Sequence, residues 1–118
     1  SNELHSVTSS AAYKEDIVDT TFDTSAIYNL QVRDFTWAKN SGSAGMKDFG
    51  LIAEEAYTVC PELVVTRKDK VLVGEEDGGK HYEDTGTDKP YSIRNAALTM
   101  AMLAEVQKLN SRVAALEK

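Results

Sequence analysis

The sequence predicts one α+β domain, with a small globular part of short β-hairpins and short helices followed by a long C-terminal helix. Three observations predict this fold class. The chain has 118 residues, of which 42% are apolar and 27% charged, as is usual for a single globular domain. Short β-branched and aromatic runs separated by turn residues fill the chain up to Tyr91. Beyond Tyr91, apolar side chains recur at helical spacing.

The N-terminal part reads as a leader followed by short elements. Residues 1–8 are polar and mixed, and we expect an extended leader. Residues 14–18 are compatible with one or two helical turns. The cluster at 23–25 contains good helix caps, so a short helix is predicted over 26–30.

The middle of the chain predicts two hairpins and a helix. Residues 30–37 and 48–52 read as strands that pair across the loop at 40–45. A helix over 53–60 has two acids in its first turn and stops at Pro61. Strand-like segments at 63–65 and 71–73 are separated by a charged turn at 66–70. The acidic, glycine-rich stretch 74–88 is expected to be a flexible loop or an extended hairpin.

The closing helix, predicted over 92–118, has the apolar pattern of a coiled coil. Its repeat alternates between steps of four and three residues. The positions in this repeat are Asn95, Thr99, Met102, Val106, Leu109, Val113 and Leu116. The alternative is one amphipathic helix folded onto its own domain. We expect packing between chains instead, because no later residues of the sequence are left to cover the last turns.

Charge and composition argue against several classes of function. The net charge is −6 and the basic residues form no patch, so nucleic-acid binding is not expected. No apolar stretch approaches the ~20 residues of a membrane span. Cys60 is the single cysteine and lies in an apolar run, where buried packing is expected. The acids of 74–88 lack the spacing of a calcium loop, and neither a metal nor a cofactor is predicted.

Ser9 and Lys14 are the candidate catalytic residues. A serine hydroxyl needs a base to become a nucleophile, and a lysine can be that base only if its pKa falls by several units from about 10.4. Residues five apart point in different directions on a helix, so Ser9 is expected in extended chain with Lys14 in the turn after it. Ser10 competes for the same role. Spacing alone is equally compatible with a helix cap and a solvated lysine.

Four motifs in order resemble the intramolecular chaperone auto-processing domain at the C-terminus of phage tailspikes, tail fibres and neck appendages. The opening SSAAYKEDI (residues 9–17) is similar to the family's Ser-[Ser/Asp]-x-x-x-Lys-x-[Asn/Asp]-Ile. The segment LQVRDFTW (30–37) stands in place of a family strand, without its usual proline. DFGLIAEEA (48–56) with CPELV (60–64) resembles the family core, and EVQKL (105–109) lies in the closing helix.

The resemblance implies that residues 9–118 form a homotrimeric chaperone domain of the endosialidase type. It would bring an upstream β-rich fibre or spike of the same polypeptide into register, and then release itself by cutting the bond between Thr8 and Ser9. Ser9 would be the nucleophile and Lys14 the base of a single-turnover serine endopeptidase. The helix would form a parallel trimeric coiled coil whose seam consists of Thr99, Met102, Val106, Leu109, Val113 and Leu116.

The resemblance also implies where the domain acts. It would work in the host cytoplasm during virion assembly and be absent from the mature particle. Two other classes stay open from the sequence. One is a trimerisation or capping module that no longer cleaves, and the other is an interaction domain with a dimeric coiled coil.

Overall fold

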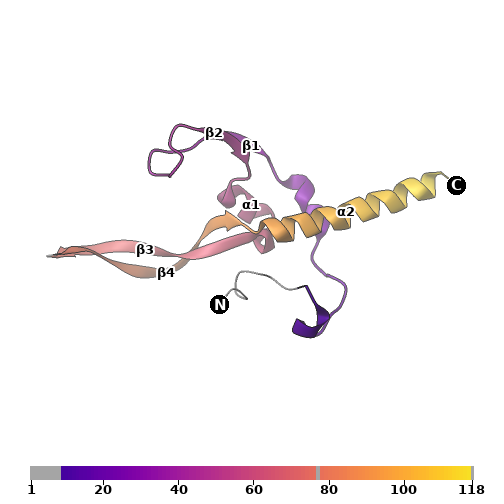
Figure 1. Ribbon diagram of the computed structural model, residues 1–118, viewed down its shortest axis with the longest axis horizontal. Coiled ribbons are helices and arrows are strands. Elements are labelled where there is room, and N and C mark those ends of the chain that lie inside the picture. Colours follow the sequence, from indigo (N-terminus) through magenta and orange to yellow (C-terminus); the bar gives the residue numbers. More distant parts are fainter. Residues whose placement is uncertain (1–8, 77, 118) are drawn as a thin grey trace.

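The computed structural model describes residues 9–76 and 78–117. Short helices and strands are followed by a long hairpin and a long helix (Figure 1). In chain order the elements are the 3₁₀ helices η2 (Ala11–Tyr13) and η3 (Thr24–Asn29), strands β1 (Arg33–Thr36) and β2 (Lys47–Gly50), helix α1 (Ala53–Val59), the 3₁₀ helix η4 (Pro61–Leu63), strands β3 (Val64–Glu76) and β4 (Gly79–Ile93), and helix α2 (Asn95–Leu116). The predicted mixture of hairpins, short helices and a closing helix is confirmed.

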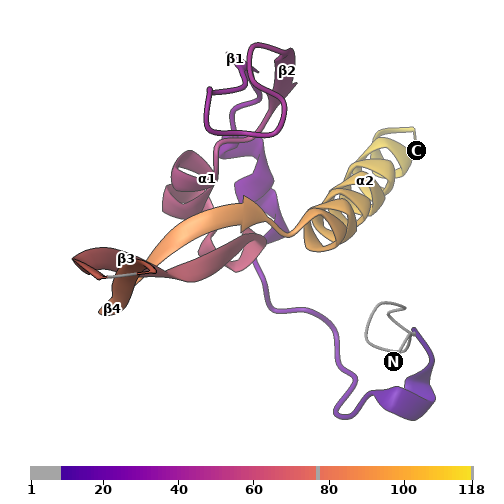
Figure 2. The ribbon, with the colours of Figure 1, turned by 60° about the vertical axis from the view of Figure 1, so that its left-hand side comes forward.

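The molecule is elongated. Its Cα radius of gyration is 19.7 Å, against about 13.5 Å for a compact domain of this length. Figures 1 and 2 show the reason, because the β3–β4 hairpin and α2 extend in different directions from a small centre that contains η3 and α1. The segment that carries η2 trails away from this centre in both views.

The first helical turn lies earlier than the sequence predicts. The prediction of helical turns over 14–18 is wrong, because the turn is η2 and residues 14–18 contain no helix. Ser10 caps η2, and its Oγ accepts a hydrogen bond from the backbone N–H of Ala12 at 3.2 Å. Asp16 has a φ of 51°, in the left-handed region, and one such residue interrupts a right-handed helix.

The short helix predicted over 26–30 is confirmed as η3, which begins two residues earlier and ends at Asn29. Asp23 caps it, since the Asp23 Oδ1 accepts a hydrogen bond from the Ser25 N–H at 3.1 Å. At the other end, the Leu30 N–H donates to the carbonyl of Ile27 at 3.1 Å. This i→i+3 bond makes the helix 3₁₀ rather than α.

The predicted hairpin and helix in the middle of the chain are also confirmed. β1 and β2 pair antiparallel, with Arg33 opposite Gly50. α1 follows directly and has Glu54 and Glu55 in its first turn. The guanidinium of Arg33 forms two hydrogen bonds with the Glu55 carboxylate, at 3.0 and 3.1 Å, and so ties β1 to α1. This fork holds the pKa of Arg33 above its usual value, first by hydrogen bonding and then by charge.

The second hairpin differs from the prediction at its centre. The turn predicted over 66–70 is wrong, because β3 runs unbroken through these residues and pairs antiparallel with β4. The stretch 74–88 lies in the far part of this extended hairpin, which is one of the two forms expected for it. The lysines that suggested a turn instead form cross-strand ion pairs, for example Lys68 with Asp88 at 3.2 Å and Lys70 with Asp84 at 3.8 Å.

A bulge interrupts the hairpin near its middle. Residues 85–87 of β4 lie opposite the single residue Asp69 of β3. Gly86 adopts a φ of 84° there, a conformation that glycine takes without steric cost. Bulges bend a strand and increase its twist, so this one contributes to the twisted shape of the hairpin.

The buried core of the described residues is small. Its apolar members are Ala56, Cys60, Leu63, Val64 and Ala101. The accessible surface of the chain is 9962 Å², against about 6,300 Å² for a compact monomer of 12.9 kDa. A single chain therefore leaves much apolar surface exposed to water.

Helix α2 begins at Asn95 rather than near residue 92, because residues up to Ile93 complete β4. The helix turns one face to its own domain. On this face Ala101 and Glu105 are buried, and Ala97, Leu98 and Ala104 are half-buried.

A buried hydrogen-bonded cluster joins η3 to this face of α2. The hydroxyl of Thr24 donates to Glu105 Oε2, and both residues are only 3% exposed. The Lys108 ammonium donates to Thr24 Oγ1 and to Glu105 Oε2, each at 2.9 Å. The Thr24 hydrogen bond, and after it Lys108, lowers the pKa of the Glu105 carboxyl below its usual value. The cluster fixes how α2 is rotated against the domain.

The lowered pKa of Glu105 predicts a pH-dependent contribution to stability. A group whose pKa is lower in the folded chain stabilises it above the unfolded value of about 4.3, and this contribution is lost as the pH falls through the folded value. We expect Glu105→Gln to unfold at lower urea concentration than wild type at pH 7. The difference should shrink below about pH 4. Urea midpoints measured from pH 3 to 7 at one protein concentration test this.

The matched control is Asp19→Asn, which makes the same carboxyl-to-amide change at an exposed position. This variant should follow wild type at every pH. A gap between wild type and Glu105→Gln that stays constant with pH would contradict the role of the charged carboxylate.

Candidate functional site

The segment around Ser9 and Lys14 is short and locally ordered. Ser9 and Ser10 lie in non-helical chain, η2 follows, and Lys14 ends the turn with its N–H donating to the carbonyl of Ala11 at 3.1 Å. This is the backbone order that the spacing predicts, with a hydroxyl before a turn and a lysine after it. Thr8, the other side of the predicted cleaved bond, lies outside the described residues.

Ser10 has a structural role that distinguishes it from Ser9. Its Oγ caps η2 through the Ala12 N–H, and its carbonyl accepts from the N–H of Tyr13 at 3.1 Å. A serine committed to a cap is held in one orientation by the turn it stabilises. This geometry favours Ser9 over Ser10 as the side chain that is available for chemistry.

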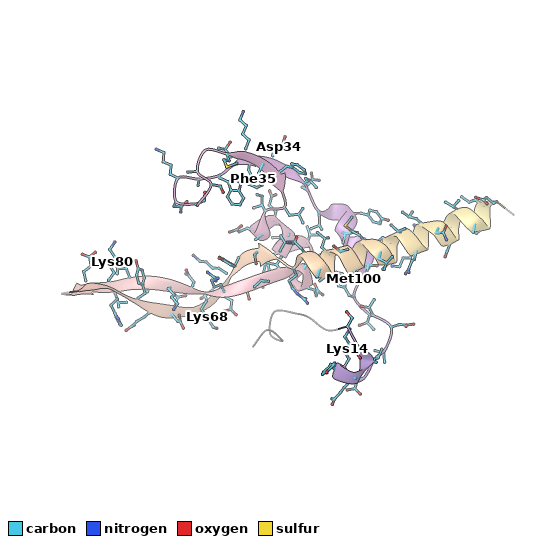
Figure 3. All side chains as sticks on the ribbon, viewed as in Figure 1. Lys14, Asp34, Phe35, Lys68, Lys80 and Met100 are labelled. Carbon is cyan, nitrogen blue, oxygen red and sulfur yellow. The ribbon has the colours of Figure 1, made fainter. Side chains whose placement is uncertain are left out.

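The segment is exposed along its whole length in the single chain. Ser9 and Lys14 are both exposed, and so are the apolar side chains of Tyr13, Ile17 and Val18, at 76%, 68% and 82%. Figure 3 shows Lys14 on the trailing segment, away from the body of the domain. A lysine acts as a base in a desolvated site, and the described residues leave Lys14 exposed.

Asp16 is a residue of this segment whose role the sequence analysis missed. It is the one non-glycine residue with positive φ among those described, at 51°. Asp and Asn tolerate the left-handed region better than other side chains, because their short polar groups bond locally. The signal was present in the opening motif, where the position two after the lysine takes Asn or Asp. Asp16 turns the chain immediately after Lys14.

The second candidate surface is the predicted seam of α2. Its described positions are all exposed, and the large side chains among them are Met102, Val106, Leu109, Val113 and Leu116, between 45% and 84% exposed. The face that packs on the domain lies beside the seam, around Ala101 and Glu105, and Met102 is the seam residue that borders the domain. The domain leaves the described seam positions exposed.

Cys60, the single cysteine, has a place in the buried core. Cys60 is 1% exposed, and its pKa is raised, mainly by burial and further by the carboxylates of Glu62 and Asp23, so the thiol is unsuited to nucleophilic chemistry. His81 lies on the exposed hairpin, 3.8 Å from Glu83. His5 lies outside the described residues. Within residues 9–76 and 78–117, no group of three acids, histidines or cysteines is placed to hold a metal ion.

No helix among the described residues has the length and apolar character needed to cross a bilayer.

Comparison with known proteins identifies the kind of domain. Residues 9–65 match a family model of the self-cleaving serine peptidase kind. The family is Chaperone of endosialidase (Peptidase_S74), and residues 9–65 are similar to it. The match begins at Ser9 and ends within β3, so it spans η2, both short strands and α1. A chaperone role accompanies membership of this family. No curated protein and no solved structure matches the chain.

The conformation of Asp16 predicts which side chains this position accepts. Asp16→Gly and Asp16→Asn should leave self-cleavage of a precursor near the wild-type rate, because both residues adopt positive φ. A β-branched side chain is a strong outlier there, so Asp16→Val should displace Lys14 at a cost of about 1–2 kcal/mol and slow cleavage. The cleaved fraction of the precursor over time is the measurement.

The control is Asp19→Val, which makes the same chemical change three positions later in the exposed segment. It should cleave like wild type. If Asp16→Val cleaves as fast as Asp16→Gly, the left-handed turn has no part in the reaction.

Proposed function

We propose that this chain is a C-terminal intramolecular chaperone that trimerises an upstream β-rich viral fibre or spike and then releases itself by autoproteolysis between Thr8 and Ser9. The observation that carries the proposal is the family match, which begins at the proposed nucleophile, Ser9. The exposed seam of α2 and the order of Ser9, η2 and Lys14 support it.

The exposed seam supports assembly through α2. In heptad terms, Thr99, Val106 and Val113 take position a, and Met102 and Leu109 take position d. Valine at a with leucine at d favours two strands in a plain coiled coil. The apolar face here is wider, because Leu98 at g and Leu103 at e flank the seam. In a two-stranded coiled coil, part of this wider apolar face would stay exposed to water. Three helices would bury more of it, and this supports a trimer.

The charges at the end of the helix support a parallel arrangement. Arg112 lies at position g and Glu117 at position e, five residues later. In parallel coiled coils a g side chain faces the e side chain five positions on in the next helix. Arg112 of one chain would therefore pair with Glu117 of its neighbour, and this pairing requires the helices to be in register.

Trimerisation at the C-terminus explains the chaperone role physically. Pairing of strands between chains brings together residues far apart in sequence, and such contacts form slowly. Until these contacts form, the unpaired strand edges are exposed and prone to aggregation. A helical trimer that forms first sets the number of chains and their alignment, so that the fibre strands then pair in one register.

The cleavage step follows from the chemistry of serine and lysine. Lys14 accepts the proton of the Ser9 hydroxyl, and Ser9 Oγ attacks the carbonyl carbon of Thr8. The C–N bond breaks, the proton passes to the departing amide nitrogen, and an ester between Thr8 and Ser9 Oγ remains. One water then hydrolyses the ester, which leaves a carboxylate on Thr8 and a free amine on Ser9. Attack on the preceding peptide of the same chain is cramped, so attack from a neighbouring chain is the other route.

The exposure of the site links cleavage to assembly. Ser9, Lys14 and the apolar side chains after them are uncovered in a single chain. In a trimer a neighbouring chain would cover this segment and desolvate Lys14, as a lysine base requires. Cleavage would then take place after assembly, in the host cytoplasm during virion assembly, and the released domain would be absent from the mature particle.

The same exposure favours one competing function, a non-cleaving trimerisation or capping module. In that case the trimer forms through α2 but Ser9 and Lys14 stay solvated. The two functions share the assembly and differ only in whether the bond before Ser9 breaks.

Cleavage is tested with a precursor in which the natural upstream segment precedes the domain. We expect wild type to give two products, the smaller beginning at Ser9, and Ser9→Ala to stay intact because the variant lacks the proposed nucleophile. Lys14→Met should also stay intact. Intact-mass spectrometry of the products is the measurement.

Ser10→Ala is the matched control, and it should still cleave, more slowly where loss of the cap loosens η2. Cleavage that persists in Ser9→Ala would remove Ser9 from the mechanism. An intact wild-type trimer would favour the capping module.

The seam predicts a position-specific effect on assembly. Leu109→Asp places a charge at the centre of the seam and should abolish trimer formation, because an unpaired buried charge costs several kcal/mol. Gln107→Asp makes the same charge on the outward side of the helix and should assemble like wild type. Light scattering gives the mass of each variant. Equal masses for the two variants would contradict the seam.

A further inference from the structure

An apolar groove lies beside the seam on the surface of each chain. It runs between the end of η3, the approach to β1 and the first turns of α2. Its lining residues are Ile27, Leu30, Val32, Leu51, Leu98 and Met102. The groove holds about 220 Å³, far more than the ~30 Å³ share of one water molecule, so it is large enough for a side chain. All six lining residues are apolar, and Val32 is 68% exposed.

Leu103 is an apolar side chain that its own domain does not cover. It is 48% exposed, although the helix on either side of it buries Ala101 and Glu105. Leu103 lies at position e of the heptad, on the opposite flank of the seam from the domain. The groove lies on the other flank, where Leu98 occupies position g. One chain thus presents an apolar groove on its g side and an exposed leucine on its e side.

Heptad geometry brings these two features together between neighbouring chains. In a parallel coiled coil the g residue of one helix faces the e residue five positions later in the next. Leu98 and Leu103 are five positions apart. Met102 belongs both to the groove and to the seam, so the groove is continuous with the proposed interface. The excess accessible surface of the single chain is consistent with further apolar contact of this kind.

We infer that the groove is the docking site for a second copy of the chain, whose Leu103 inserts beside Leu98 between Ile27, Val32 and Leu51. The inference rests on the proposed trimer. The globular part of each chain would then pack against α2 of its neighbour, in addition to the contacts along the seam. Because only one axial alignment places Leu103 opposite the groove, the contact sets the register of the three chains to the residue.

Cross-linking between two differently tagged chains tests the contact. One chain carries Val32→Cys in the groove and the other carries Leu103→Cys, and the two are co-expressed and treated with a short bismaleimide. Cys60 is left in place, because it is 1% exposed and its thiol is not available. The matched control pairs Val32→Cys with Met100→Cys, which is 58% exposed on the same helix at the outward position b.

We expect a covalent dimer of unlike chains with Leu103→Cys, at a yield at least several-fold above that with Met100→Cys. Light scattering of the same samples reports assembly separately. A trimer in which the two yields are equal would overturn the docking contact and leave the proposed trimer standing. If light scattering gives wild type the mass of a single chain, both the proposed trimer and the contact are overturned.

Discussion

The contact on which the arrangement of this chain depends is the buried cluster of Thr24, Glu105 and Lys108. It joins one face of α2 to η3 through a buried carboxylate whose Oε2 accepts hydrogen bonds from both Thr24 and Lys108. A buried carboxylate keeps its charge only with such partners, so the helix cannot roll without leaving it unpaired. The rotation fixed in this way leaves the line from Met102 to Leu116 facing water. One chain thus leaves an apolar line along α2 uncovered.

The segment that carries Ser9 and Lys14 is exposed in the same way. Ser9 and Lys14 have the predicted order around η2, and Asp16 turns the chain after them, but the described residues leave the segment exposed. A self-cleaving domain benefits from this separation. If the neighbouring chain supplies the cover, the bond before Ser9 is stable until three chains have met. Assembly and cleavage then occur in the order that a chaperone requires.

Sequence patterns predicted the elements whose signals are local. The strands around Arg33 and Gly50, the short helix after Asp23 and the helix before Pro61 all lie where turn residues, caps and β-branched runs place them. The turn expected over 66–70 failed because its lysines are satisfied by aspartates on β4, a pairing that no local pattern reveals. For the site, the sequence predicted Ser9 in extended chain and Lys14 in the turn after it. The left-handed Asp16 and the buried Glu105 were missed, since both depend on backbone angle and distant partners.

The central claim is that α2 joins three chains, because each leaves the same apolar line uncovered. Sedimentation equilibrium of the wild-type chain tests this most directly, since it gives mass independently of the elongated shape. The account predicts a single species of about three times 12.9 kDa. A species of 12.9 kDa, or of twice that mass, would contradict it.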